Sequence, residues 1–466
     1  LIMKMKSGRC WLLPGKIPNC SERADMDYQN LTIVESLDLI RRGQVSAEQL
    51  TEACRVAIDA RNPVLNAFVA DTVQVNDSAE APQGELGGIP IVIKDLIDVA
   101  GWPTRAGSPK FFGQEPALRD AFVVDRLKYA GAKLLGKVNT HEVALGLTGI
   151  NPHTGPVRNP HNPERISGGS SSGSAVAVAS GMAFGALGTD TGGSIRTPAA
   201  LCGVVGFKPT FGRVSTRGVL PLSWNLDHVG PLARTVADVA LLYSVIAGYD
   251  PQDPNSVLVP PAFQPQKDIS DFRVALAVGE YIAEADPEIL TALGRAAETL
   301  ANLGAEIVEV EIPRLREAAQ ANGMMVIADA AAFHRERLAE HPDWFGSDVR
   351  ERLERGLALP SSEYILARRV QSEMKRYFAL FFDQFDVLLL PTTASVAAPI
   401  DGLDSAAYAP RLTRFTAPFN LTGLPALTVP FGLSGDGLPI GLQLVGPAWS
   451  EQVVLQAGQA LEQAQK

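Results

Sequence analysis

Residues 167–174 read Ser167-Gly168-Gly169-Ser170-Ser171-Ser172-Gly173-Ser174, and a second run, Asp190-Thr191-Gly192-Gly193-Ser194-Ile195-Arg196, follows them. Each run places a serine hydroxyl among glycines, where backbone N–H groups can approach a ligand without side chains in the way. Upstream, a lone lysine, Lys94, ends the apolar stretch Ile89-Pro90-Ile91-Val92-Ile93. A nucleophilic hydroxyl, a second hydroxyl that relays a proton and an amine base are sufficient for acyl transfer. The three segments therefore predict that chemistry.

Other catalytic motifs fit the two runs less well. Residues 169–173 match the G-x-S-x-G pattern of a nucleophile elbow, but that motif needs a strand directly before the serine. Residues 158–167 are polar and proline-rich, so we expect a loop there. The triplet at 190–192 resembles half of an aspartic-protease dyad, yet the chain has no second triplet to share the proton. Neither run has the lysine of a phosphate-binding loop or the context of a dinucleotide site.

Taken singly, each feature also has an ordinary structural explanation. A lysine at the end of a strand usually extends to water, and a Gly–Ser run is usually a linker or a turn. The combination favours a site, because Ser170 and Ser194 each stand at the start of a predicted helix. Thr191, Gly192 and Gly193 also offer consecutive N–H groups beside Ser194, and an oxyanion hole is built in this way.

With these motifs the chain resembles the amidase signature family of Ser–Ser–Lys hydrolases. Three segments carry the resemblance, at residues 88–95, 168–175 and 188–196, and 24 residues (194 − 170) separate the two serines. Further similarity runs from about Leu31 to the end of the chain, including residues 226–231 and 437–443. One departure is Ser172, where the family often has glycine. The resemblance is specific for the fold and the catalytic groups, and weak for the substrate.

The resemblance implies a role for each reactive side chain. Ser194 is expected to be the nucleophile, Ser170 the relay held by a cis peptide bond, and Lys94 the base. The backbone N–H groups of Thr191, Gly192, Gly193 and Ser194 are expected to receive the oxyanion. No metal ion or nucleotide cofactor is needed.

Two further expectations concern charge in this region. The family resemblance implies that Asp190 and Arg196 form an ion pair that holds the loop. Lys94 must be uncharged to accept a proton, although a free lysine has a pKa of about 10.4. Burial disfavours the ammonium form, and the apolar run before Lys94 offers such surroundings. We therefore expect a lowered pKa for Lys94.

Strands alternate with helices along the chain, which predicts an α/β architecture. We expect a single large domain over residues 28–466, with a mixed central β-sheet covered by helices on both faces, as in the amidase signature fold. Residues 1–27 are expected to be a poorly ordered N-terminal extension. Residues 313–385 are predicted to be largely helical and to cover the core near the substrate entrance.

Composition restricts the partners and the compartment. The 466 residues carry a net charge of -10, which argues against a nucleic-acid-binding surface. The longest weakly polar run, residues 175–187, is too short to span a bilayer, so no membrane association is expected. The four cysteines are too widely spaced for a disulfide framework or a zinc site, which indicates a reducing, cytoplasmic setting. We expect a monomer or a homodimer.

The substrate predicted from the resemblance is a small molecule with an amide, ester or carbamate (urethane) carbonyl, including aryl amides. A free-standing bacterial amidase is the first interpretation. Two alternatives stay open: the glutamine-hydrolysing A subunit of a tRNA-dependent amidotransferase, and a partner-dependent subunit without catalysis. The amidotransferase subunits carry an acidic residue near the position of Thr413, and this chain does not. Ala144 and Leu145 are predicted to line the substrate pocket, where a small residue at 144 leaves room for a bulky group.

Overall fold

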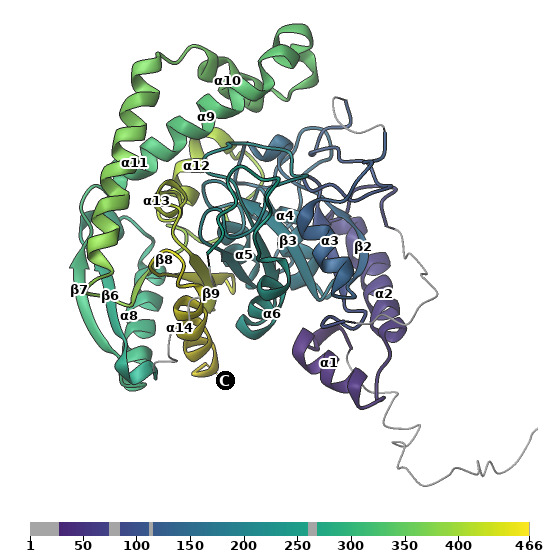
Figure 1. Cartoon of the computed structure of the whole chain (residues 1–466), viewed down its shortest axis with the longest axis horizontal. Coiled ribbons are helices and arrows are strands. Elements are labelled where there is room, and N and C mark those ends of the chain that lie inside the picture. The colour runs from purple at the N-terminus through teal and green to yellow at the C-terminus, as the bar shows by residue number, and fades with distance from the viewer. Residues whose placement is uncertain (1–27, 74–83, 111–114, 260–267, 466) are drawn as a thin grey trace, which may run out of the picture.

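A ten-stranded mixed β-sheet runs through the protein, in a computed structural model that describes residues 28–73, 84–110, 115–259 and 268–465 (Figure 1). The strands lie side by side in the order β2-β1-β3-β5-β4-β9-β10-β8-β6-β7. Their bounds are β1 Pro90–Lys94, β2 Lys133–Val138, β3 Gly185–Asp190, β4 Val205–Lys208, β5 His228–Ala233, β6 Arg273–Val278, β7 Glu306–Glu311, β8 Val387–Pro391, β9 Ala426–Leu433 and β10 Pro439–Val445. The extension predicted for residues 1–27 lies outside the described residues.

The direction of the strands changes across the sheet. At one end β2, β1 and β3 are mutually parallel, and at the other end β8, β6 and β7 are parallel as well. The strands between these two groups pair antiparallel, from β3 through β5, β4, β9 and β10 to β8. Because parallel strands end at the same edge of a sheet, the carboxyl ends of β1 and β3 meet, and the residues that follow them come together.

Helices flank this sheet and complete a single α/β domain, as the sequence predicts. All residues of β1, β3, β5, β8 and β10 are buried, so neither face of the sheet is open to solvent at these strands. The helices are α1 Ile33–Arg41, α2 Ala47–Leu65, α3 Phe122–Tyr129, α4 Ser172–Ala179, α5 Arg196–Cys202, α6 Val236–Ile246, α7 Glu280–Ala283, α8 Pro287–Asn302, α9 Leu315–Glu340, α10 Ser347–Leu357, α11 Ser361–Phe381, α12 Ser405–Thr413, α13 Ala417–Thr422 and α14 Glu451–Gln463.

Local sequence signals explain where many elements begin and end. Helix α2 begins after Ser46, whose hydroxyl accepts the N–H of Gln49 while the Gln49 side chain accepts the N–H of Ser46. This reciprocal capping box satisfies two N–H groups that the first turn of a helix leaves without partners. The buried helix α4 starts at Ser172, two residues later than the sequence suggests. Residues 158–167 contain no strand, as expected for the loop before it.

Residues 313–385 contain the three helices α9, α10 and α11. Figure 1 shows them together at one side of the molecule, where α9 crosses above the sheet and α11 runs down past its edge. Helix α9 packs against α10, α11 and α13, so the segment is joined to the core through α13. This arrangement places one face of α9 above the residues that follow β3.

The sequence does not predict three of the central strands. They are β3, β4 and β5, and β3 reads Gly185-Ala186-Leu187-Gly188-Thr189-Asp190. Small residues and glycine have low strand propensity, so this segment gives little local signal. The small side chains leave room for the helices: a Cβ atom added at Gly188 would lie 2.7 Å from Ser171 Oγ. Tertiary packing, rather than local preference, makes this segment a strand.

Candidate active site

Three elements bring Lys94, Ser170 and Thr189 together. Lys94 is the last residue of β1, Thr189 lies near the end of the parallel neighbour β3, and Ser170 precedes α4. The Nζ atom of Lys94 lies 2.7 Å from Ser170 Oγ and 2.7 Å from Thr189 Oγ1. All three side chains are buried. Thr189 lies inside the motif at 188–196, but the sequence predicts no role for it.

The environment of Lys94 favours its neutral form. Burial lowers the pKa of Lys94 to about 7, and the nearby carboxylates of Asp190 and Asp227 oppose that shift. A lysine whose pKa lies near neutrality is able to accept a proton at physiological pH. The expected lowering of the Lys94 pKa is therefore confirmed in direction.

The peptide bond between Gly169 and Ser170 is cis, as the family resemblance implies. The carbonyl oxygen of Ser170 accepts hydrogen bonds from Thr140 Oγ1 at 2.9 Å and from the N–H of His141 at 3.2 Å. These contacts hold the Ser170 backbone while its hydroxyl faces Lys94.

Ser194 lies in the turn between β3 and α5 and borders a cavity. Its carbonyl oxygen accepts the N–H of Ser171 at 3.1 Å, so the two glycine-rich runs are joined by a backbone hydrogen bond. The motifs predict that Ser170 and Ser194 belong to one site, and the fold brings their segments together.

The four backbone N–H groups expected to form the oxyanion hole are not equivalent. The N–H of Gly193 donates to Asp190 Oδ1 at 2.8 Å, so it braces the turn, and its expected role as an oxyanion donor needs correction. The N–H groups of Thr191, Gly192 and Ser194 have no acceptor among the residues that the structure describes. These three groups are available to a ligand beside Ser194.

Asp190 and Arg196 form the expected ion pair at the base of this turn. Arg196 donates from Nε to Asp190 Oδ2 at 3.0 Å and from Nη2 to Asp190 Oδ1 at 2.9 Å, and both side chains are fully buried. Burial alone would raise the pKa of Asp190, but the charge and hydrogen bonds of Arg196 outweigh it and hold that pKa well below its usual range. The fixed carboxylate also accepts the N–H of Ile195.

Residues distant in the sequence complete the surroundings of Arg196. Asn420 accepts from Arg196 Nη2 at 2.6 Å and donates to Asp190 Oδ1 at 2.8 Å, and the carbonyl of Thr416 accepts from Arg196 Nη1 at 3.0 Å. The Thr416 hydroxyl donates to the carbonyl oxygen of Gly192 at 2.7 Å. The sequence gives no local signal for these partners, because they lie 220 or more positions away.

Asp227 fixes the same turn from the other side. Its Oδ1 accepts the hydroxyl of Thr191 at 2.7 Å, and its Oδ2 accepts the N–H groups of Leu222 and Ser223 at 2.8 and 3.1 Å. Burial raises the pKa of Asp227 to about 6, although these hydrogen bonds and the charge of Lys94 oppose the rise. The sequence motif at 226–231 contains Asp227, but nothing in the motif assigns it this position.

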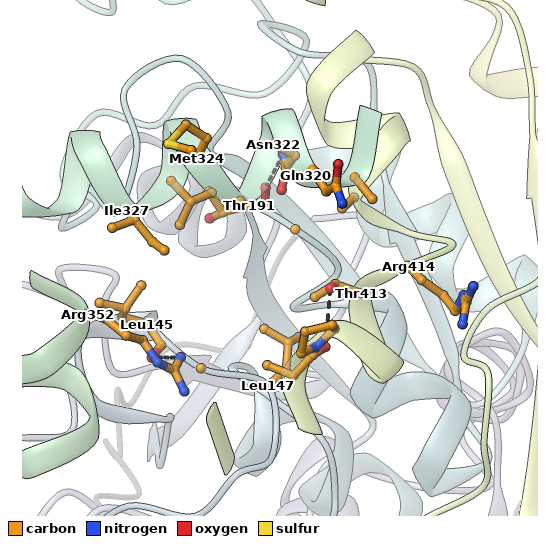
Figure 2. A pocket seen from close by; sticks show the side chains of 18 of the residues that line it. Leu145, Leu147, Thr191, Gln320, Asn322, Met324, Ile327, Arg352, Thr413 and Arg414 are labelled. Atoms are coloured by element: carbon orange, nitrogen blue, oxygen red, sulfur yellow. Dashed lines mark hydrogen bonds between the residues drawn. The ribbon is translucent and has the colours of Figure 1, made fainter. Parts of the chain in front are cut away.

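The cavity beside Ser194 has a volume of about 930 Å³. Its walls come from residues 144–147, 191–194, 316–327, 352–359 and 406–417. Ala144 and Leu145, which are predicted to line the substrate pocket, are among the residues that line this cavity. Figure 2 shows Met324 and Ile327 of α9 across the cavity from Leu145. No Asp or Glu occurs among the described residues that line this cavity.

The described part of the chain contains neither a cluster of metal ligands nor a membrane-spanning helix. There, no group of three or more His, Cys, Asp or Glu side chains is arranged to hold a metal ion. None of the helices in the same residues combines the length and the apolar character needed to cross a membrane. Cys54 and Cys202 are buried free thiols.

Comparisons with known proteins identify the family and agree with the fold. A family model described as amidase matches residues 49–455. The chain is 38% identical to the A subunit of the glutamyl-tRNA(Gln) amidotransferase of Chloroflexus aurantiacus, over 94% of this chain and 97% of that protein. It is also 38% identical to an amidase of Pseudomonas putida, over 93% of this chain and 96% of that protein. A crystal structure of an amidase has a TM-score of 0.81 at 36% identity, covering 93% of this chain and 99% of that chain.

Proposed function

This chain belongs to the amidase signature family of carbon–nitrogen hydrolases, and on that premise we propose that it is a stand-alone serine amidase. It cleaves the C–N bond of a carboxylic amide through an acyl-enzyme. The observation that carries the proposal is the buried 2.7 Å contact between Lys94 Nζ and Ser170 Oγ, since the residue after Ser170 donates its N–H to the carbonyl oxygen of Ser194. A neutral amine in hydrogen-bond reach of a hydroxyl is the arrangement that activates a serine nucleophile.

The proposed reaction begins with two proton transfers. Neutral Lys94 accepts the proton of Ser170, Ser170 accepts the proton of Ser194, and the oxygen of Ser194 attacks the substrate carbonyl. The resulting oxyanion accepts hydrogen bonds from the N–H groups of Thr191, Gly192 and Ser194. Removal of one such donor typically costs about 3–4 kcal/mol of transition-state stabilisation.

Collapse of the tetrahedral intermediate completes acylation. Ser170 returns its proton to the leaving nitrogen, the C–N bond breaks, and the amine departs. A water molecule then gives its proton to the same relay and attacks the acyl-enzyme, which releases the acid and restores Ser194. In both halves of the reaction, Lys94 and Ser170 carry the proton between Ser194 or water and the leaving group.

The cavity supports a substrate larger than a simple primary amide. Its volume of about 930 Å³ and the small side chain of Ala144 leave room for an aromatic or otherwise bulky group next to Leu145. Aryl amides, carbamates and esters present a carbonyl of similar geometry to Ser194, so we include them in the proposed range. The helices of residues 313–385 would form the entrance side of the pocket.

A second candidate is the glutamine-hydrolysing component of an amidotransferase. The relative in Chloroflexus aurantiacus favours it, because that protein is described as the A subunit of a glutamyl-tRNA(Gln) amidotransferase. The cavity favours the stand-alone amidase. Thr413 lines the wall, and the described lining has no carboxylate to pair with the ammonium group of glutamine.

A hydrolysis screen with the purified chain alone separates these candidates. The substrates are anilides, primary amides including glutamine, carbamates and p-nitrophenyl esters. A stand-alone amidase is expected to turn over at least one amide other than glutamine, without ATP or a second protein. Hydrolysis of glutamine alone, and only after a co-purifying protein is added back, would assign the chain to the amidotransferase class instead.

A further inference from the structure

Asn322 is a buried polar side chain at the cavity that the proposed reaction does not use. It lies on α9, is 2% exposed, and lines the cavity next to the turn that carries Ser194. Its Nδ2 atom donates a hydrogen bond to the carbonyl oxygen of Thr191 at 3.2 Å, which Figure 2 shows as a dashed line. An amide side chain has a donating NH₂ group and an accepting oxygen, so a partner for the accepting oxygen of Asn322 has to be identified.

The hydrogen bond to Thr191 fixes the orientation of the Asn322 amide. A backbone carbonyl oxygen only accepts, so the group that faces Thr191 must be the NH₂ end. The Oδ1 atom then points toward Gly192, and a Cβ atom added at Gly192 would lie 3.2 Å from it. Among the hydrogen bonds of the described residues, the Asn322 side chain takes part as the donor to Thr191 and not as an acceptor. This acceptor is therefore directed at the ligand space beside two of the oxyanion donors.

We propose that Asn322 is a specificity-determining residue whose Oδ1 accepts a hydrogen bond from the N–H group of a substrate bound at Ser194. The proposal rests on the proposed amidase function. Primary and secondary amides carry such an N–H group, and so do carbamates with an unsubstituted N–H. Esters and tertiary amides of the same shape do not, and they leave the acceptor without a partner.

The consequence is discrimination between substrates of nearly identical size. An apolar pocket discriminates poorly between substrates of the same shape. A site that accepts a hydrogen bond from a substrate N–H group, in contrast, rejects the analogue that lacks this group. Asn322 therefore raises the rate for N–H-bearing substrates relative to the matched ester. It also holds Thr191, so loss of its side chain affects every substrate to some degree. The ratio of the two rates, rather than either rate alone, reports the proposed contact.

The test compares the wild-type enzyme with Asn322→Ala on three substrates that share one acyl group. They are 4-nitroacetanilide, N-methyl-4-nitroacetanilide and 4-nitrophenyl acetate, followed by kcat/KM. We expect the anilide-to-ester ratio to fall at least about tenfold in Asn322→Ala, equivalent to about 1.4 kcal/mol. We also expect the preference for the anilide over its N-methyl analogue to shrink by a similar factor.

A matched control is Gln320→Ala, which removes another amide side chain from the same helix and the same cavity. Gln320 is exposed, and its removal is expected to leave the anilide-to-ester ratio unchanged.

Equal losses of kcat/KM on the anilide and the ester in Asn322→Ala would overturn the proposal. Asn322 would then only support the backbone of Thr191. If Asn322→Ala does not fold, the wild-type enzyme still decides, because equal kcat/KM for the anilide and its N-methyl analogue would overturn the proposal too. No turnover of any of the three substrates by the wild type would instead count against the amidase function itself.

Discussion

Lys94 Nζ and Ser170 Oγ lie 2.7 Å apart in a site closed to solvent, and this contact joins the end of β1 to the glycine–serine run before α4. Burial disfavours a charged lysine here more strongly than Asp190 and Asp227 favour it. The proposed chemistry needs a proton acceptor, and this balance supplies one near neutral pH.

The pH dependence of turnover follows from that balance. Lys94 is protonated below its pKa of about 7 and unable to act as a base, so kcat/KM is expected to rise with pH and level off above this value. Initial rates between about pH 5 and 9 on an uncharged amide measure the profile. Lys94→Arg keeps a cation that does not deprotonate and should remain inactive across the range. An acidic optimum would contradict the role of Lys94.

Asp227 should move the same profile. Its carboxylate raises the pKa of Lys94, so Asp227→Asn is expected to shift the rise in kcat/KM to lower pH. The substitution also weakens the hold on Thr191, which lowers the plateau. The matched control is Asp253→Asn, which removes a buried carboxylate that contacts Ser215 and Thr216 instead. An Asp227→Asn profile that coincides with the wild type, or moves to higher pH, would show that the two groups do not interact as described.

The ion pair of Asp190 and Arg196 should be important for folding as well as for turnover. Arg196→Met leaves the fully buried carboxylate of Asp190 without its main partner. Loss of one member of a buried pair typically lowers the free energy of unfolding by about 3–5 kcal/mol. Chemical denaturation measures this loss. Arg196→Lys keeps the charge without the planar fork and is expected to lose less stability than Arg196→Met. Equal stability of Arg196→Met and the wild type would contradict the structural role of the pair.

Gly193 is a position where a single methyl group should disrupt the turn. Its φ of +136° is unfavourable for other residues, and an added Cβ would lie 2.3 Å from Thr416 Oγ1 and 2.9 Å from Thr197 Oγ1. Gly193→Ala is therefore expected to lose turnover, with strain of about 1–3 kcal/mol on the backbone alone. The rate of anilide hydrolysis and the melting temperature both report the change.

Gly294 provides the matched control for that substitution. It lies within α8, has no atom within 4 Å of an added Cβ, and is absent from the cavity lining. Gly294→Ala is expected to keep full activity and to raise the free energy of unfolding by about 0.5–1 kcal/mol, because alanine favours the helix. A Gly193→Ala enzyme as active as Gly294→Ala would show that the turn tolerates the added group.

Local sequence motifs point to the proposed reactive groups of the site more clearly than to its walls. Lys94, Ser170 and Ser194 lie in short motifs whose glycines and apolar residues are themselves the signal. The cis bond at Ser170 and the pair of Asp190 with Arg196 follow from the same family pattern. The exception within the motif is Gly193, whose N–H turns to Asp190 because the carboxylate lies inside the turn.

The remaining parts of the site depend on tertiary contacts that no local pattern encodes. Asn322 lies on a helix whose sequence predicts only that it belongs to a polar segment that covers the core. Thr416 lies at the start of α13 and contacts the carbonyl oxygen of Gly192, which is 224 positions away. Asn420 lies within α13 and contacts the carbonyl oxygen of Asp190, which is 230 positions away. Strand β3 is missed for a related reason, since its small residues have little strand propensity of their own. These positions become recognisable only when the ten strands are assembled.

Covalent labelling of Ser194 tests the central claim most directly. A fluorophosphonate probe reacts with an activated serine, and mass spectrometry of the digested protein locates the modified residue. We predict a single adduct on Ser194 in the wild type, no adduct in Ser194→Ala, and strongly slowed labelling in Lys94→Ala and Ser170→Ala. An adduct on a different serine, or near-normal amide hydrolysis by Ser194→Ala, would contradict the account.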